Sequence, residues 1–208
     1  MKAYLRLFPL PWVVFPGEKL NLHVFEERYR HLINECLQEK SSFGIPFFQD
    51  GIIRFGTMVS VEELKRTYPD GRMDISVRGL EAFEVLDFKE KTSGKLYPGG
   101  KIQTIPLNPD FDPMLEETLE KLFDKFFNLL GQRPEGDPAC LLSFRFAHKL
   151  GLSLDQELEL LLLPTETARQ EFLKLHLQSL LPALEKGEAA KIRIRQNGHF
   201  RSFDPLKF

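Results

Sequence analysis

Cysteine is scarce in this sequence, with Cys36 and Cys140 as its only two copies. Two isolated cysteines are too few for a disulfide framework and lack the spacing of a zinc site. Both fall on the apolar faces of expected helices, which predicts that they pack in the core. A reducing cytoplasm is the simplest location that fits this cysteine content.

Long apolar runs are also missing. The run at residues 160–163 is as long as any and falls far below the roughly 20 residues that span a bilayer. The N-terminal segment contains Pro9 and Pro11 and has no small-residue cleavage site. We therefore expect no transmembrane helix and no signal peptide.

Neither sign of charge is in clear excess. The chain has 28 Lys and Arg against 30 Asp and Glu, for a formal net charge of -2. Nucleic-acid binding depends on clustered basic residues, so this balance disfavours it. Residues 186–208 are locally basic, however, and Asn197-Gly198 lies there between alternating flanks, which is a strong hairpin signal.

Aromatic residues that carry a polar group are few, with 4 Tyr and 1 Trp against 19 Phe. A buried Phe needs no hydrogen-bond partner, whereas buried Tyr and Trp do. Phe is therefore the expected core filler of this chain. Phe residues without an evident core position, among them Phe200, Phe203 and Phe208, become candidates for binding.

The first 108 residues show the period-2 alternation of half-buried strands. Residues 53–61 and 73–78 alternate most clearly, and Tyr68-Pro69-Asp70-Gly71 between them predicts an antiparallel hairpin. Further strands are expected at residues 4–8, 20–24, 83–88 and 101–105. One helix, about residues 26–39, interrupts them.

Helical patterns follow at residues 109–185. Asp112 is expected to cap a helix that begins at Pro113 and ends before Gly131. A second helix is expected from Asp137 to about residue 150. Ser153 and Gln156 form a capping box for a third helix, and a fourth runs from its cap at Thr165 to about residue 185. The sequence thus predicts three parts, residues 1–108, 109–185 and a basic tail at 186–208.

Catalytic motifs are not evident. No phosphate-binding Gly-x-x-x-x-Gly-Lys-Ser/Thr pattern and no Gly-x-Ser-x-Gly turn occurs. His23, Glu27 and His31 have the spacing of metal ligands on one helix, but His23 falls in an alternating strand pattern, so ordinary structural histidines are the favoured interpretation. We expect no metal, no cofactor and no enzyme activity.

Five motifs in series resemble the N-terminal domain of Lon proteases, most closely the stand-alone bacterial type without ATPase and peptidase domains. The first spans residues 7–17 and ends in Phe15-Pro16-Gly17, and the second, residues 20–30, contains Phe25-Glu26-Glu27-Arg28-Tyr29. Residues 43–45, 55–57 and 69–72, followed by Gly79 and Phe83, continue the pattern. Glu27 stands where the family usually has Pro.

The resemblance implies an α+β fold, a PUA-like β pseudo-barrel with one inserted helix followed by a small helical bundle. It also implies a role in recognising unfolded or exposed apolar segments of other proteins, with a separate protease as a further expected partner. The ATPase and peptidase activities of full Lon proteases do not carry over.

Three apolar residues are the candidates for peptide binding: Trp12, which follows two prolines, and the adjacent Phe47 and Phe48 in a loop-like segment. Adjacent residues on a strand face opposite sides, so one Phe is expected to be exposed. The alternative is that Phe48 packs under the helical half. The remaining motif residues are expected to be structural: Phe15, Pro16, Gly17, Phe25, Glu26, Arg28, Tyr29, Gly56, Asp70, Gly71 and Gly79.

Two other functions stay open at this point. PUA-like barrels elsewhere bind RNA, and the basic tail offers phosphate contacts. An enzyme is the other, because a catalytic cleft can assemble from residues distant in the sequence.

Overall fold

The computed structural model describes residues 2–91 and 94–186. The chain divides into two compact units, one up to Pro106 and the other from Leu107 onward. The predicted basic tail with its Asn197-Gly198 hairpin lies outside the described residues. Within them, no helix combines the length and apolar character needed to cross a membrane.

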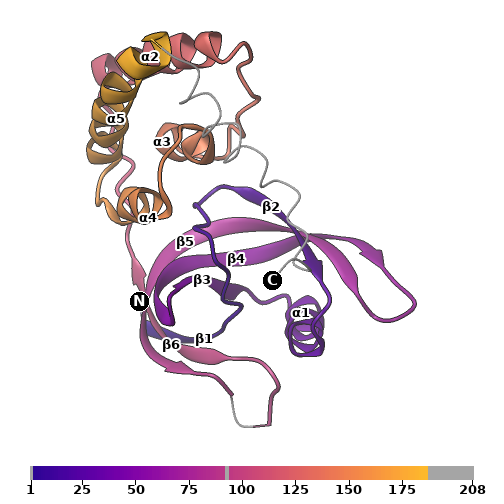
Figure 1. Cartoon of the computed structure of the whole chain (residues 1–208). Helices are drawn as coiled ribbons and strands as arrows, with labels where there is room; N and C mark the ends of the chain where they lie inside the picture. Colours follow the sequence, from indigo (N-terminus) through magenta and orange to yellow (C-terminus); the bar gives the residue numbers. More distant parts are fainter. Residues whose placement is uncertain (1, 92–93, 187–208) are drawn as a thin grey trace. The chain divides into compact units, whose positions relative to one another are not determined.

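The first unit is a six-stranded antiparallel sheet curled into a barrel, with one helix between its second and third strands (Figure 1). Its elements are β1 (Lys2–Arg6), β2 (Lys19–Val24), α1 (Glu27–Glu39), β3 (Phe43–Gln49), β4 (Ile52–Thr67), β5 (Met73–Lys89) and β6 (Gly99–Ile105). The strand order is β1-β6-β5-β4-β3, and β2 pairs separately with β5. Parallel bridges Leu7↔Gly44 and Leu10↔Phe47 connect the segment after β1 to β3 and so close the barrel. The predicted α+β fold with a β pseudo-barrel is confirmed.

The β4–β5 hairpin forms where the sequence predicts it. Gly71 has φ +84° and donates its N–H to the carbonyl of Tyr68, which is the turn that Pro69-Asp70-Gly71 favours. Met73, Ile75 and Val77 all face the core at 2% exposure or less. The alternating pattern therefore identified both the strand and its buried face.

The segment around Phe47 is a strand and not the loop that the sequence suggested. Pro46 lies in β3, which is unusual because proline cannot donate to a sheet ladder. It is accommodated opposite Gly56, next to the point where the β3–β4 register shifts. A Cβ on Gly56 would lie 2.4 Å from the Pro46 Cα, so only glycine fits there.

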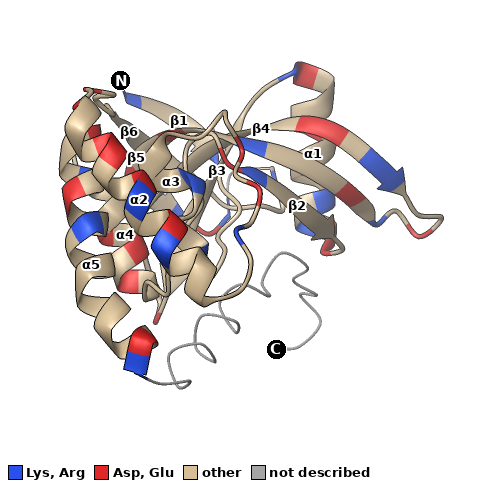
Figure 2. Ribbon diagram, turned by 90° about the horizontal axis from the view of Figure 1, so that it is seen from above, with Lys and Arg blue, Asp and Glu red and all other residues tan. Residues whose placement is uncertain are grey.

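The second unit consists of helices α2 (Pro113–Leu129), α3 (Leu142–Arg145), α4 (Leu154–Leu162) and α5 (Glu166–Lys186), with a 3₁₀ turn at Ala147–Lys149. Asp112 caps α2 and the Ser153–Gln156 capping box begins α4, both as predicted. Both acidic and basic residues lie along α2 and α5 (Figure 2). A core of aromatic and aliphatic side chains fills the unit, including Phe123, Phe126 and Phe146.

The single helix predicted from Asp137 to about residue 150 is wrong. The Asp137 side chain accepts the N–H of Ala139 at 2.9 Å, and its carbonyl accepts the N–H of Cys140, so a turn forms first. Such local side-chain bonds compete with helix formation. The helix begins only at Leu142. Cys140 is buried as expected, but it does not lie on a helix.

Candidate functional site

A cleft of about 210 Å³ lies on the barrel unit. Three segments form it: the chain after β1, the strand β2, and the start of α1. Most of the lining is apolar or aromatic. The residues that line the cleft are Phe8, Pro9, Leu10, Pro11, Trp12, Asn21, Leu22, His23, Phe25, Glu26, Arg28 and Tyr29.

The wall at residues 8–12 is fixed by backbone hydrogen bonds to β3. Phe8 donates to the Gly44 carbonyl at 2.8 Å, Leu10 donates to the Pro46 carbonyl at 3.1 Å, and the Leu10 carbonyl accepts from Phe48 at 2.8 Å. Pro9 and Pro11 further restrict this segment, because a proline ring fixes φ. The wall is therefore rigid although it has no strand of its own.

The floor of the cleft is a pair of stacked rings. Phe8 and Tyr29 lie with centroids 3.9 Å apart and an interplanar angle of 17°. Both are buried, and they join the core cluster that contains Leu22. Burial raises the pKa of Tyr29 to about 12, so its hydroxyl stays protonated in the physiological range.

An ion pair between Glu26 and Arg28 lies at the start of α1. The Glu26 Oε2 accepts from Nε of Arg28 at 2.8 Å, and Nη2 lies at the same distance. The guanidinium also lies 4.6 Å from the centroid of the Tyr29 ring. The pair supplies charge of both signs and no net charge.

His23 lies on β2, as its alternating pattern predicted, and bonds to Asp74 of β5 at 2.6 Å. Tyr68 donates its hydroxyl to the other oxygen of Asp74 at 2.8 Å. The hydrogen bond from His23 is the main cause that lowers the pKa of the Asp74 carboxyl. Across residues 2–91 and 94–186, no group of three or more His, Cys, Asp or Glu side chains could hold a metal ion.

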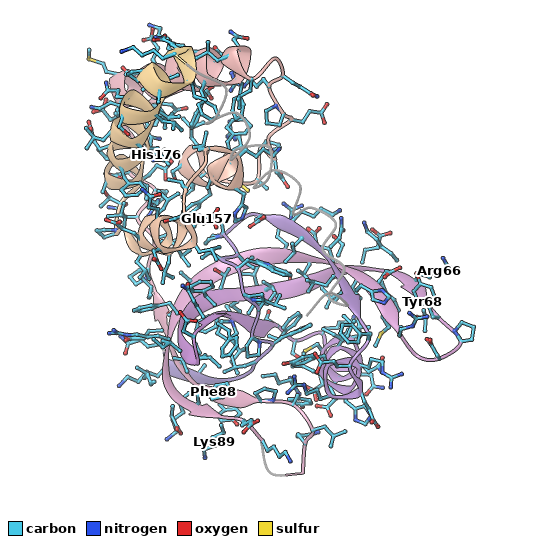
Figure 3. The ribbon with its side chains drawn as sticks, viewed as in Figure 1. Arg66, Tyr68, Phe88, Lys89, Glu157 and His176 are labelled. Carbon is cyan, nitrogen blue, oxygen red and sulfur yellow. The ribbon has the colours of Figure 1, made fainter. Side chains whose placement is uncertain are left out.

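Two guanidinium groups lie near the Tyr68 ring, one from Arg66 of β4 and one from Arg72 in the turn before β5. The Cζ of Arg66 lies 4.5 Å from the ring centroid, and that of Arg72 lies 5.1 Å from it. Figure 3 shows Arg66 and Tyr68 near the far end of the β4–β5 hairpin. This cluster is the most evident concentration of cations next to an aromatic ring in the barrel unit.

The structure separates the three residues proposed for binding. Trp12 lines the cleft and is half-buried. Phe47 is only 7% exposed, whereas Phe48 is 43% exposed and lies outside the cleft lining. Ile52 of the same hairpin is 65% exposed, but it lies opposite Gln49, whereas Phe48 lies opposite Ile53, so the Phe48 and Ile52 side chains face opposite sides of the sheet.

Three of the family-motif residues build the turn that leads into β2. Phe15 is fully buried, Pro16 is buried, and Gly17 has φ +82° and donates to the Gly79 carbonyl at 2.9 Å. A Cβ on Gly79 would lie 2.1 Å from the Phe15 carbonyl oxygen. Only glycine allows this approach, so these residues hold the chain that connects the cleft wall to β2.

The motif residues Asp70 and Gly71 hold the hairpin turn. Asp70 accepts from the N–H and the Nε of Arg72, and its carbonyl accepts from Arg30 of α1 at 2.6 Å. The side chain of Arg30 would meet a Cβ on Gly71 at 2.6 Å. The turn is therefore attached to the helix that begins at the cleft.

Sequence reasoning missed several lining residues. Phe25 was expected to be structural and was not proposed for binding, but it is only half-buried and lines the cleft. Pro9, Pro11 and Asn21 were not proposed for binding, although they lie in the motif segments. Their clustering in those segments was the available signal, since a surface shared by neighbouring motifs is a natural place for a site.

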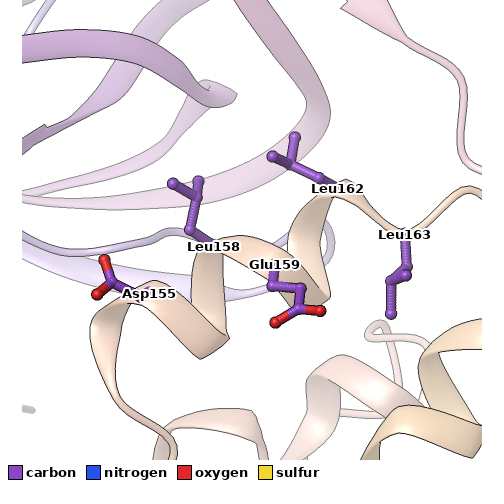
Figure 4. A pocket seen from close by; sticks show the side chains of 5 residues that line it. All are labelled: Asp155, Leu158, Glu159, Leu162 and Leu163. Atoms are coloured by element: carbon purple, nitrogen blue, oxygen red, sulfur yellow. The ribbon is translucent and has the colours of Figure 1, made fainter.

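The helical unit has a second hollow of about 410 Å³, formed by α4 and the residue after it. Its lining is Asp155, Leu158, Glu159, Leu162 and Leu163. Figure 4 shows Leu158 and Leu162 on one side of the helix and Leu163 pointing to the other. The three leucines therefore do not converge, and this hollow is a weaker candidate than the cleft.

Comparison with known proteins identifies the family. Residues 4–181 match the family described as ATP-dependent protease La (LON) substrate-binding domain. The crystal structure of a Lon N-terminal domain protein from Xanthomonas campestris is 31% identical, covers 81% of this chain and 95% of its own, and has a TM-score of 0.62. The N-terminal domain of a Mycobacterium avium complex Lon protease, at 13% identity, covers 85% of this chain and 98% of its own with a TM-score of 0.62, which supports the fold alone. The chain belongs to the Lon substrate-binding domain family.

Proposed function

We propose that this chain is a non-catalytic module that binds extended apolar segments of other proteins in the cleft, and that it acts as an adaptor in proteolysis or protein quality control. Its family is defined by a substrate-binding domain, which supports protein segments as the ligand class. A separate protease would then degrade what this chain captures.

The observation that carries the proposal is the composition of the cleft. Trp12 and Phe25 are half-buried and line a space whose floor is the Phe8–Tyr29 stack. Its volume of about 210 Å³ is below the roughly 300–1,000 Å³ usual for small-molecule sites. The space therefore suits one or two apolar side chains of a longer chain better than a cofactor.

Trp12→Ala tests the proposal directly. The probe is fluorescein-labelled, reduced and carboxymethylated α-lactalbumin, a permanently unfolded chain, and binding is followed by fluorescence anisotropy. Aromatic anchors at the centre of an interface commonly contribute about 2 kcal/mol or more, so we expect at least a tenfold loss of affinity.

Phe111→Ala is the matched control, because Phe111 is an aromatic residue that is 67% exposed and lies in the other unit. It should bind the probe like the unaltered chain. Failure of the unaltered chain to bind, or equal binding by Trp12→Ala, would contradict the proposal. Circular dichroism of each variant verifies that it is folded.

The hairpin surface at Phe48 is a second contact for the same client. Phe48→Ala is expected to weaken binding less than Trp12→Ala, since Phe48 lies outside the cleft. Phe47→Ala is not a suitable test of contact, because truncating a buried Phe destabilises the fold.

RNA binding is the alternative function, supported by the arginine side chains around Tyr68. Aromatic rings beside guanidinium groups can stack on unpaired bases while the cations contact phosphates. Binding of a fluorescein-labelled oligouridine that weakens steeply with salt and is reduced by Arg66→Ala would favour it. Absence of binding at low salt would reject it.

A further inference from the structure

The strand β2 has one open edge. Among the described residues it pairs with β5 alone, in the register Lys19↔Arg78 to Val24↔Met73. An open edge exposes unpaired N–H and C=O groups that can pair with another chain. Proteins usually protect such an edge.

The cleft lies along this edge. Asn21, Leu22 and His23 are consecutive in β2, and all three line the cleft, whereas no residue of β5 does. Successive side chains of a strand point to opposite faces, so a space that touches three in a row meets the strand at its edge.

The hydrogen-bond phase shows which groups face outward. Gly79 donates its N–H to the carbonyl of Glu18 at 2.9 Å. The backbone groups of Glu18, directly before β2, therefore point toward β5. In an antiparallel pair, residues alternate between bonding the neighbour and pointing away from it. Continuing that alternation, Leu20, Leu22 and Val24 bond to β5, and the backbone groups of Asn21 and His23 point toward the cleft.

The charges around this edge favour an uncharged segment. Arg28 pairs with Glu26, and His23 bonds to Asp74. The Glu, Arg and His side chains at the cleft thus each have a hydrogen-bond partner within the protein. A charged residue of a ligand would have to compete with these pairs, whereas an apolar residue of a ligand can pack against Trp12 and Phe25.

We propose that the bound segment adds as a β-strand to the open edge of β2, pairing with the backbone of Asn21 and His23. One set of its alternate side chains enters the cleft and the other faces solvent. This inference rests on the proposed function and adds the way in which the segment is recognised. The protein forms hydrogen bonds with the backbone of the segment, and the side chains of the segment need only be apolar at every second position.

Peptide chemistry tests this mode on the unaltered protein. Overlapping peptides from α-lactalbumin are screened by fluorescence anisotropy, and the tightest is resynthesised with one N-methyl group at each successive residue. Strand addition predicts an alternating result. N-methylation at every second residue of the bound core should lower the affinity tenfold or more. N-methylation at the residues in between should change the affinity less than about threefold. A profile without alternation overturns the inference.

Asn21→Pro tests the same mode from the side of the protein. Proline removes the N–H that faces the cleft and leaves the ladder to β5 intact, a position where an edge strand tolerates it. The control is Asn21→Ala, which keeps the N–H and removes the same side chain, including its bond from Lys65. We expect Asn21→Pro to bind the peptide about three- to tenfold more weakly than Asn21→Ala. Equal affinities of two folded variants would count against strand addition.

The outcomes separate this inference from the proposed function. If the peptide binds and Trp12→Ala weakens it, but N-methylation shows no alternation, the cleft binds clients and strand addition is wrong. If no peptide binds the unaltered chain, both are wrong.

Discussion

Arg169 of α5 is a fully buried arginine on which the helical unit depends. Its Nε bonds to the carboxylate of Glu166 at 3.0 Å, Nη1 donates to the Leu163 carbonyl at 2.7 Å, and Nη2 donates to the Asn108 carbonyl at 3.3 Å. The guanidinium carbon lies 5.0 Å from the centroid of the Phe144 ring. One side chain thus connects the start of α5, the end of α4 and the chain before α2.

Replacing Arg169 with Met removes the charge and keeps most of the side-chain volume. The lost stability therefore comes mainly from electrostatics and not from a cavity. Glu166 would remain buried, still accepting from Ser143 and Gln170 but without its counter-ion. Removing one partner of a buried ion pair costs about 3–5 kcal/mol. We expect Arg169→Met to lower the free energy of unfolding by that amount. Adding Glu166→Gln in the same chain removes the remaining charge and should restore part of the lost stability.

Urea unfolding measures the loss with two probes. Far-UV circular dichroism follows mainly the helices, and fluorescence of Trp12, the only tryptophan, follows the barrel unit. The matched control is Lys174→Met, which breaks an ion pair of similar spacing with Glu171 on the same helix. That pair is partly exposed, so its loss should cost less than about 1 kcal/mol.

Equal costs for Arg169→Met and Lys174→Met would refute the reasoning. So would a double variant with Glu166→Gln that is no more stable than Arg169→Met alone. A loss seen by dichroism but not by Trp12 fluorescence would show in addition that the two units unfold separately.

Two further predictions concern the barrel unit. Gly79→Ala should destabilise it by about 1–3 kcal/mol, because the new Cβ would clash with the Phe15 carbonyl; an unchanged urea midpoint of Trp12 fluorescence would contradict this. Glu35 accepts from Lys95 and Tyr97, and the Lys95 hydrogen bond is the main cause that lowers its pKa below the usual glutamate range. A carboxyl group whose pKa is lower in the folded state than in the unfolded state stabilises the fold at pH values above its unfolded-state pKa. This stability is lost as the pH falls through the folded-state pKa. Glu35→Gln should therefore lose less stability on acidification than the unaltered chain, and parallel pH curves would refute the assignment.

The elements that the sequence predicted correctly are those decided by neighbouring residues. Tyr68-Pro69-Asp70-Gly71 contains its own turn chemistry, and the Ser153–Gln156 box satisfies the orphan amides of its helix without outside help. The same holds for Thr165, whose hydroxyl accepts the N–H of Ala168 at 3.0 Å. In each case the signal and the structure lie within a few residues.

Two of the errors occurred where contacts between distant residues decide the structure. Pro46 made its segment resemble a loop, and only the pairing with Gly56 in the next strand allows it to be part of β3. The cleft was missed for the same reason. Trp12, Asn21 and Phe25 come from three segments, and a linear pattern does not show that the chain after β1 bonds to β3 and returns beside β2.

The cleft wall and the closure of the barrel are made by the same hydrogen bonds. The bonds that join Phe8 and Leu10 to β3 complete the barrel and also position the Pro9–Trp12 wall. At its other end the segment is fixed by the approach of Phe15 to Gly79. A wall held at both ends by the fold loses little conformational entropy when a ligand binds, which leaves more of the contact energy for affinity. In the function that we propose, the loss of conformational entropy on binding falls mainly on the client segment, and an extended apolar segment of an unfolded protein has no native structure that must first be broken.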